Sequence, residues 1–429
     1  MADAVTQFST ISTDAPNVWI AERMYQLAER RLQVGQWAQK YTLPQRMSKT
    51  MRVVRYRRLT LPTSVLTEGV APDAVALAVD NVDVTVEQWG IVVLITDVGL
   101  ITTKHPALNI AIQRTALAMA EVLEREMAVM LLGGTNIYYG GTSRTARTQL
   151  AAGDNIATGL LLQATTFLRA KGAPDWENGL FGGVMPSQAE SDIVKSDITF
   201  QNSKNYADVK ALQYSEIGVW AGTRWTRGNF LPHFRGEAAP SATAATAVKA
   251  QVTIGTAGSM ATGNYQVVVV ARETNSYYER RVSQNSANLA VVGPSGSISV
   301  VMPSNTSYVY DVYMSDAGAT SAKLISSANA ASATYVITAV SSVTTTSPAA
   351  PADGVEVFVA WVFGQDAFGR VELSGMSLQS FITPAGASYS NPLAQGRKVG
   401  SKVMWKSFIQ DNNYFVRLEF TSSFSAYLP

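Results

Sequence analysis

The sequence predicts an α+β protein in which long strands lie along one long helix and a separate all-β module is inserted in the later half of the chain. Three observations predict this fold class. Apolar residues recur with helical spacing from His105 to Leu132, residues 51–97 have the pattern of strands, and the composition changes sharply between about Glu237 and Asp353. A helix of this length with only one apolar face needs a sheet or long strands packed along it.

The composition is that of a folded protein and excludes several classes of function. Its 429 residues are 47% hydrophobic and 15% charged, enough for two or three domains with apolar cores. The formal net charge of +2 provides no global field for nucleic acid or an anionic membrane. The absence of cysteine excludes disulfides, thiol catalysis and cysteine-ligated metals. The N-terminus does not resemble a secretory signal and no apolar run reaches about 18 residues, so we expect a cytoplasmic protein without a membrane span.

The helix predicted from His105 to Leu132 has clear start and stop signals. Pro106 suits a first helical turn, where its missing N–H costs nothing, and Gly133 with Gly134 can end the helix. Its length corresponds to a rod of roughly 40 Å at about 1.5 Å per residue. One face carries the apolar side chains of Leu108, Ile112, Ala116, Met119, Leu123, Met127 and Met130.

Strand-like segments at about 51–62 and 82–97 surround a turn-rich stretch and predict an extended β-arm. Isolated two-stranded ribbons are only marginally stable in water, so the arm should lie on a neighbouring subunit. The region also contains basic residues without an acidic partner between them, namely Lys40, Arg46, Lys49, Arg52, Arg55, Arg57 and Arg58. Two interpretations stay open: a solvated or partner-paired strand, and contact with bound or packaged nucleic acid.

Outside the long helix and the arm, helical and strand patterns alternate. Helices are expected over about Asn17–Lys40, Ile156–Ala170 and 187–197, and short strands mixed with turns over 206–230. From 237 to 354 the chain is rich in Ala, Ser, Thr and Val, and its short strands have nearly regular spacing. This pattern is typical of a sandwich of immunoglobulin or fibronectin type, which we expect to be an autonomous domain inserted on a loop.

Nothing in the sequence indicates an enzyme. No nucleophile elbow, zinc-protease, Walker or dinucleotide-binding motif is present. His105 and His233, the only histidines, are interpreted as structural. Gly179, Gly182 and Gly183 are interpreted as a tight turn rather than a phosphate cradle. We therefore expect no catalytic residue, cofactor or metal.

Three local runs resemble one known family. LTEGVAPDAVALAVDNVDVTVEQWG (66–90) is similar to that family's arm tip and returning strand, and ITDVGLITTKHPALNIAIQR (95–114) to the entry into its long helix. YSEIGVWAGTRW (214–225) is similar to its central-domain signature. The family is that of the major capsid proteins of tailed bacteriophages with the Hong Kong 97-type fold, in a podovirus-like branch. The resemblance covers most of the chain outside the inserted module.

The resemblance implies a domain organisation. It consists of an N-terminal arm and helix (1–50), an E-loop β-arm (51–104), a peripheral domain with the spine helix (105–154), a first part of the axial domain (155–236), the inserted Ig-like β-sandwich (237–354), a second part of the axial domain (355–396) and terminal strands of the peripheral domain (397–429). The inserted sandwich departs from the minimal family pattern, and we expect it on the outer surface of the particle.

The resemblance also implies a function. Such a chain self-assembles into hexamers and pentamers that close an icosahedral shell around double-stranded DNA, without sequence-specific binding, in a virion made in the host cytoplasm. Scaffolding, portal and decoration proteins are candidate partners, and no cofactor or metal is implied. The candidate inter-subunit contacts are Arg55, Arg57, Arg58 and Glu68 on the arm and Arg224 in the axial domain.

Three alternatives remain beside this interpretation. An encapsulin-type shell protein shares the fold but encloses protein, so the contents of purified particles would distinguish it. A tail or fibre virion protein can also carry Ig-like modules, but such proteins are mainly β and lack the long amphipathic helix. A sugar-binding or hydrolytic surface enzyme would need a signal peptide and a convergent polar site, and the sequence displays neither.

Overall fold

The computed structural model has an α+β fold in which strands predominate. It describes residues 5–6, 33–56, 59, 61, 65, 74–96, 107–176, 179–196, 216–228, 231–274, 278–340, 342–375, 378–383 and 396–424. The chain divides into two compact units, and each is described by itself. The first comprises 1–32, 38–123 and 366–411, and the second comprises 33–37, 124–365 and 412–429.

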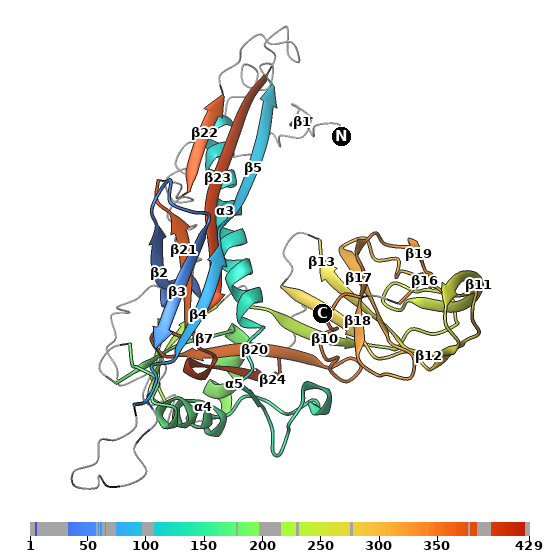
Figure 1. Ribbon diagram of the computed structural model, residues 1–429, viewed down its shortest axis with the longest axis horizontal. Coiled ribbons are helices and arrows are strands. Elements are labelled where there is room, and N and C mark those ends of the chain that lie inside the picture. Colours follow the sequence, from blue (N-terminus) through green and yellow to red (C-terminus); the bar gives the residue numbers. More distant parts are fainter. Residues whose placement is uncertain are drawn as a thin grey trace. The chain divides into compact units, whose positions relative to one another are not determined.

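A six-stranded sheet forms the framework of the first unit (Figure 1). Its order is β1 (Val5–Thr6), β5 (Glu87–Thr96), β23 (Gly396–Ile409), β21 (Phe368–Leu373) and β2 (Gln39–Leu43), and β22 (Gln379–Thr383) also pairs with β23. The 14-residue strand β23 lies antiparallel to β5, from Gly396↔Thr96 to Trp405↔Glu87. This long pairing joins segments that are about three hundred positions apart in the chain.

A continuous helix, α3 (Ala107–Leu131), lies within the range where the sequence predicts one. Its first part belongs to the first unit, where Ala111 packs with Ile95 of β5 and Val399 of β23. Its last two turns belong to the second unit, where Met127 is fully buried. The apolar face predicted for this helix is therefore used in the cores of both units.

The helix predicted over 17–40 is wrong at its end, and residues 17–32 lie outside the described part of the chain. Gly35–Trp37 form a short 3-10 turn (η2), and β2 follows at Gln39–Leu43. β2 pairs in parallel with β21 over five residues. Gly35 weakens a helix, and the Tyr-Thr-Leu segment of β2 is well suited to a half-buried strand.

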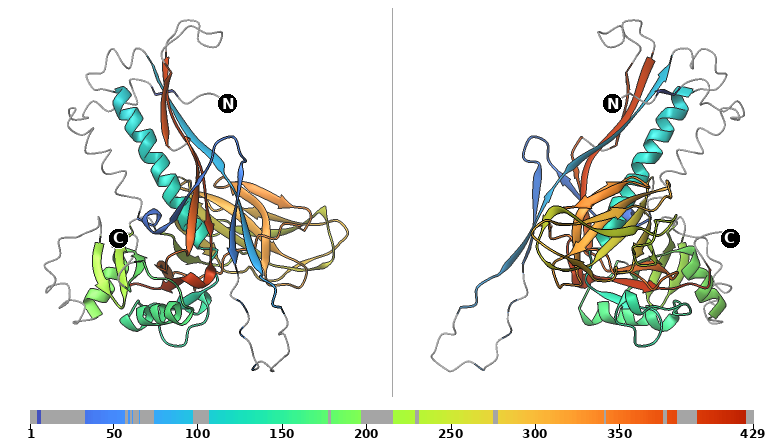
Figure 2. Two further views of the ribbon diagram at one scale, coloured as in Figure 1. Left: turned by 60° about the vertical axis from the view of Figure 1, so that its left-hand side comes forward. Right: turned by 90° about the vertical axis from the view of Figure 1, so that its right-hand side faces the viewer.

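A two-stranded ribbon of β3 (Thr50–Tyr56) and β4 (Val79–Thr85) also belongs to the first unit (Figure 2). The two strands are antiparallel, with Thr50 opposite Thr85 and Tyr56 opposite Val79. The predicted second strand of the arm is divided, because the chain changes partner at Val86 and continues as β5 in the six-stranded sheet. Val86 is fully buried at this change of partner.

An 11-stranded sheet forms the framework of the second unit. Its strands are β6 (Ile137–Tyr139), β7 (Phe181–Met185), β8 (Glu216–Trp220), β9 (Thr223–Arg227), β10 (His233–Glu237), β13 (Val267–Glu273), β14 (Glu279–Ser283), β17 (Tyr308–Ser315), β18 (Ala322–Asn329), β20 (Glu356–Phe363) and β24 (Phe415–Phe420). The helices α4 (Thr158–Ala170) and α5 (Ser187–Ser196) pack against it through Leu161, Leu168 and Ile193. β20 is buried from Val357 to Phe363, as expected for a central strand.

The module at 237–354 consists of two sheets around an apolar core. The first is the part of the 11-stranded sheet that contains β13, β14, β17 and β18. The second sheet is formed by β11 (Gln251–Met260), β16 (Gly296–Val301) and β19 (Thr334–Ile337), beside the short pair β12 (Gly263–Tyr265) and β15 (Leu289–Val291). Ile298 and Tyr310 are buried between the sheets. The module is continuous with the larger sheet of its unit, because β10 pairs in parallel with β14 from His233↔Glu279 to Glu237↔Ser283. β10 thus satisfies the backbone groups that an independent sandwich would expose at the edge strand β14.

The two glycines Gly182 and Gly183 lie inside the buried strand β7, so their assignment to a tight turn is wrong. A Cβ added to Gly182 would approach the Trp37 ring to 2.6 Å at Cδ2, and one on Gly183 would approach Trp225 Cε3 to 2.6 Å. Real Cβ contacts do not occur at such distances, so each glycine provides the space into which one indole ring packs. The Trp37 and Trp176 rings meet edge to face, with centroids 5.5 Å apart.

Substituting Gly182→Ala is expected to lower the free energy of unfolding by about 1–3 kcal/mol, because the new methyl group must displace the Trp37 ring. Gly159→Ala in α4 is the matched control, since a Cβ there meets nothing within 4 Å. Chemical denaturation of the two variants and the wild-type chain measures the difference. A Gly182→Ala variant as stable as wild type would show that the close packing on Trp37 is not required.

Candidate functional site

The two faces of the β3–β4 ribbon differ in character because side chains alternate along each strand. One face carries Met51, Val53, Val82 and Val84, which pack in an apolar cluster with Phe408 and neighbouring strands of the first unit. The opposite face is exposed and contains polar and apolar side chains in turn. The ribbon is therefore fixed to its own unit on one side and open on the other.

Two arginines of the ribbon are paired within their own chain. Arg52 donates two hydrogen bonds to Asp83 across the exposed face, at 2.6 and 2.7 Å, and these bonds lower the pKa of Asp83. Arg55 points inward, where it contacts Asp80 at 3.4 Å and forms an ion pair with Asp411. The partner-paired interpretation therefore holds for these two members of the basic stretch.

The other predicted contact residues are distributed unevenly over the structure. Arg57, Arg58 and Glu68 lie outside the described residues. Arg224 lies on β9 of the second unit, opposite Gly182 of β7 and Val219 of β8, and is partly buried. Arg55 is the one predicted contact of the arm whose surroundings are described.

Large apolar side chains are exposed on the ribbon and on the segments that continue from it. They are Val54, Tyr56, Leu59, Leu61, Val65, Val75, Leu77 and Val79, with exposed fractions from 42% to 94%. We call this set the ribbon apolar residues. Contiguous exposed apolar surface on a soluble protein commonly marks an interaction site. The sequence analysis identified the arm but not these side chains, although their alternation with polar residues was a usable signal.

A groove of about 370 Å³ lies on the six-stranded sheet of the first unit. Gly90 and Gly400 leave space between neighbouring strands, and Val92 and Phe381 line the groove with exposed apolar surface. Lys398 and Lys402 line it as well, and the Lys402 ammonium lies 4.7 Å from the centre of the Phe381 ring. The groove can accept an extended segment with acidic and apolar residues. Sequence analysis missed it because its residues come from three strands.

The carboxylate of Glu124 on α3 is buried and binds the chain segment just before η2. Its Oε1 accepts hydrogen bonds from the backbone N–H groups of Gln33, at 3.1 Å, and Val34, at 2.8 Å. Burial raises the pKa of Glu124 to about 7, against the opposing effect of these backbone N–H groups. Sequence reasoning missed this contact, because the partner segment is about 90 residues away in the chain.

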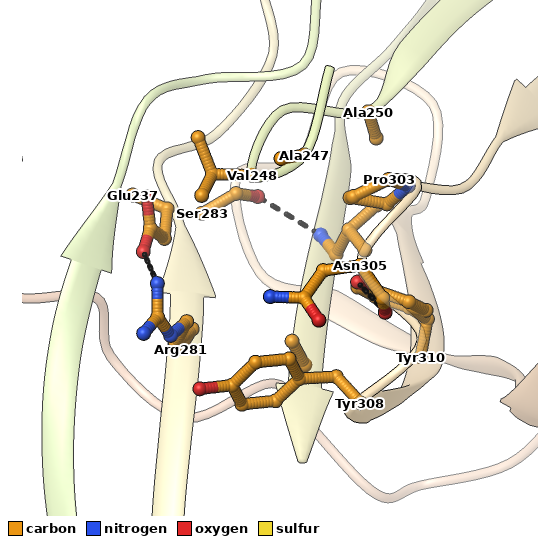
Figure 3. Close-up of a pocket in the computed structure, with 12 residues that line it drawn as sticks. Glu237, Ala247, Val248, Ala250, Arg281, Ser283, Pro303, Asn305, Tyr308 and Tyr310 are labelled. Carbon is orange, nitrogen blue, oxygen red and sulfur yellow. Dashed lines mark hydrogen bonds and ion pairs between the residues drawn. The ribbon is translucent and has the colours of Figure 1, made fainter. Parts of the chain in front are cut away.

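A small pocket lies in the module, between strands of the larger sheet and the segments around Val248 and Asn305 (Figure 3). Glu237 accepts a hydrogen bond from Arg281 at 3.1 Å, and the Tyr310 hydroxyl donates to the Asn305 carbonyl at 2.9 Å. Burial raises the pKa of Tyr310 to about 12 and also raises that of Glu237. The volume of about 20 Å³ is sufficient for one water molecule, not for an organic ligand.

The described residues contain no group of three or more His, Asp or Glu side chains that could hold a metal ion. No helix in the described part of the chain is long and apolar enough to cross a membrane. His233 stacks on Phe358 with ring centres 5.9 Å apart, and burial lowers its pKa. His105 lies outside the described residues.

Comparison with solved structures identifies the fold. The capsid of Ralstonia phage GP4 is similar at 11% identity over 91% of this chain and 88% of that one, with a TM-score of 0.52. The head structure of Helicobacter pylori bacteriophage KHP40 is similar at 9% identity over 96% and 95% of the two chains, with a TM-score of 0.51. This chain has the fold of a phage capsid protein.

The capsid fold accounts for the whole length of the chain. The capsid asymmetric unit of cyanophage Pam1 is similar at 11% identity over 99% of this chain and 100% of that one, with a TM-score of 0.50. No protein-family model matches the sequence, and no curated protein matches it significantly. At such low identities the likeness to capsid proteins lies in the fold.

Proposed function

We propose that the chain is the major capsid protein of a tailed bacteriophage and self-assembles into hexamers and pentamers of an icosahedral shell. The observation that carries the proposal is the capsid fold, which extends over nearly the full length of this chain and of three phage capsid chains. The ribbon apolar residues support it, because an exposed apolar arm requires a partner surface. No catalytic role is assigned.

The arm formed by β3, β4 and the segment between them is proposed to be the E-loop, which docks on a neighbouring copy. The lysine-lined groove is proposed as its acceptor. Charge complementarity supports this pairing, since the segment between the strands contains Glu68 and Asp73 while the groove contains Lys398 and Lys402. Arg55 holds the ribbon on its own unit through Asp411, and Arg57, Arg58, Glu68 and Arg224 are the candidate contacts across subunits.

Several finer assignments belong to the same proposal. The shell encloses double-stranded DNA without reading its sequence, with scaffolding, portal and decoration proteins as partners, and is made in the host cytoplasm. The α3 helix acts as the spine, and the 237–354 module is an Ig-like insertion on the outer surface. The domain boundaries are those that the sequence predicts.

Electron microscopy of the purified chain, expressed alone, tests the proposal. Closed shells or hexameric capsomers are the expected result. Long tubes without closed ends would favour a tail protein. Shells that contain protein cargo instead of DNA when isolated from an infected host would favour an encapsulin-type protein.

The double substitution Val54→Ser and Tyr56→Ser is expected to block assembly without unfolding the chain. Val54 is about half exposed and Tyr56 more so, so their change should alter the free energy of unfolding by only about 0.5 kcal/mol. Leu162→Ser is the matched control, because Leu162 is half exposed on α4, outside the ribbon. Sedimentation and negative-stain microscopy measure assembly. Normal shells from the double variant would contradict a docking role for the ribbon.

A charge exchange tests the groove as the acceptor. Lys402→Glu and Glu68→Lys are each expected to reduce assembly, and their combination in one chain is expected to restore it, because the two charges meet between copies. Lys171→Glu, at the exposed end of α4, is the control for a general effect of lost positive charge. Failure of the combined variant to assemble better than either single variant would argue against this contact.

A further inference from the structure

Three arginines gather where the module joins the rest of the second unit, two of them on neighbouring strands. Arg272 on β13 lies directly opposite Arg280 on β14, and Arg280 lies beside Phe234 on β10. The guanidinium carbon of Arg147 lies 3.6 Å from the centre of the Phe234 ring. The charges of Arg272 and Arg147 both act on Arg280, so the three guanidinium groups lie near one another.

The outer two arginines each have a carboxylate partner. Arg147 makes a bidentate contact with Glu419 at 2.8 and 2.5 Å, and Arg417 adds a contact to Glu419 at 2.9 Å. Arg272 makes a bidentate contact with Asp311 at 2.6 and 2.7 Å. Asp311 also accepts the backbone N–H of Ala328 at 2.9 Å. The Glu419 and Asp311 carboxylates therefore already form ion pairs with other arginines.

The central arginine, Arg280, forms no ion pair with a described residue, and the charge of Asp311 acts on it only weakly. Within the described part of the chain no acceptor bonds to Arg280, and its Nε is buried without a hydrogen-bond partner. Burial first, and then the charge of Arg272, lower the pKa of Arg280. Like charges opposite each other on neighbouring strands are destabilising, and a buried unpaired donor costs free energy. Among the described residues, the ion pairs of Arg147, Arg417 and Arg272 use the carboxylates Glu419 and Asp311, so positive charge is in excess around Arg280.

We propose that Arg280 binds a small tetrahedral oxyanion, of the class of inorganic phosphate, between the two ion pairs. A guanidinium group binds such oxygens in a bidentate manner, and the bound anion would neutralise the excess charge beside Arg272. The inference does not depend on the assembly function.

Thermal unfolding of the full chain in sodium phosphate and in sodium chloride of equal ionic strength tests the site. Phosphate is expected to raise the Tm of wild type with a saturating dependence on concentration, since it binds the folded state. Arg280→Met, which keeps an unbranched apolar stem and removes the charged guanidinium group, is expected to abolish that rise and to be more stable than wild type in chloride. Lys323→Met, a surface lysine of the same module, should respond as wild type does.

An equal rise of Tm in wild type and Arg280→Met, or no rise in wild type, would overturn the proposal. Loss of assembly in Arg280→Met together with no phosphate effect would assign the counter-charge to a carboxylate of another copy, and would also overturn it. Should Arg280→Met not fold, calorimetric titration of wild type with phosphate decides the matter. One saturable site per chain supports the proposal, and no binding refutes it.

Discussion

Substituting Glu419→Gln is expected to lower the free energy of unfolding by about 3–5 kcal/mol, among the largest effects of any single change in the chain. The Glu419 carboxylate has no exposed surface, and the Arg147 and Arg417 side chains that bind it are less than a tenth exposed. Removing its charge leaves two buried guanidinium groups without a counter-ion. Denaturation in urea, followed by near- and far-ultraviolet circular dichroism, measures the loss.

The control for this prediction is a pair on the surface. Asp316→Asn removes a contact of similar length to Lys323, 2.6 Å, but both side chains are about a third or more exposed. Exposed pairs contribute roughly 0–1 kcal/mol, so this variant should be nearly as stable as wild type. A Glu419→Gln variant no less stable than Asp316→Asn would contradict the prediction and would mean that solvent reaches the buried cluster.

Substituting Glu124→Gln is expected to remove a dependence of stability on pH that the wild-type chain has between about 4.5 and 7. Burial raises the pKa of Glu124 from 4.5 to about 7, so in this window the folded chain keeps a proton that the unfolded chain releases. The contribution of protonated Glu124 to the free energy of unfolding is complete below pH 4.5 and is lost as the pH rises to 7. A shift of this size corresponds to a loss of about 3 kcal/mol.

The glutamine side chain retains an oxygen that can accept the N–H groups of Gln33 and Val34. Glu124→Gln should therefore match the protonated wild type at pH 5 and be more stable than wild type at pH 8. Glu126→Gln, on the same helix beside Arg125, is the control for a general effect of removing negative charge. Denaturation of the three proteins at both pH values provides the comparison. Equal pH dependence in wild type and Glu124→Gln would disprove the assignment.

Local patterns in the sequence were sufficient for the elements whose structure depends on one face or one turn. The three-and-four spacing after Pro106 predicted a long helix, and α3 extends over Ala107–Leu131. The strand-like segments at 51–62 and 82–97 predicted a two-stranded arm, and β3 with β4 forms one. The short strands of 237–354 likewise follow from their composition. Motif resemblance, rather than periodicity, pointed to the capsid fold.

Only the tertiary structure decided which elements pair and which polar groups meet. The parallel pairing of β10 with β14 joins the module to the larger sheet, although the sequence predicted an independent domain. The change of partner at Val86 divides the predicted second strand of the arm. Glu124 acquires its raised pKa from a segment about 90 residues away, and Gly182 is needed for the ring of Trp37. Periodicity reports which side of a segment is apolar, whereas register and pairing depend on contacts between distant segments, and these contacts leave no local pattern in the sequence.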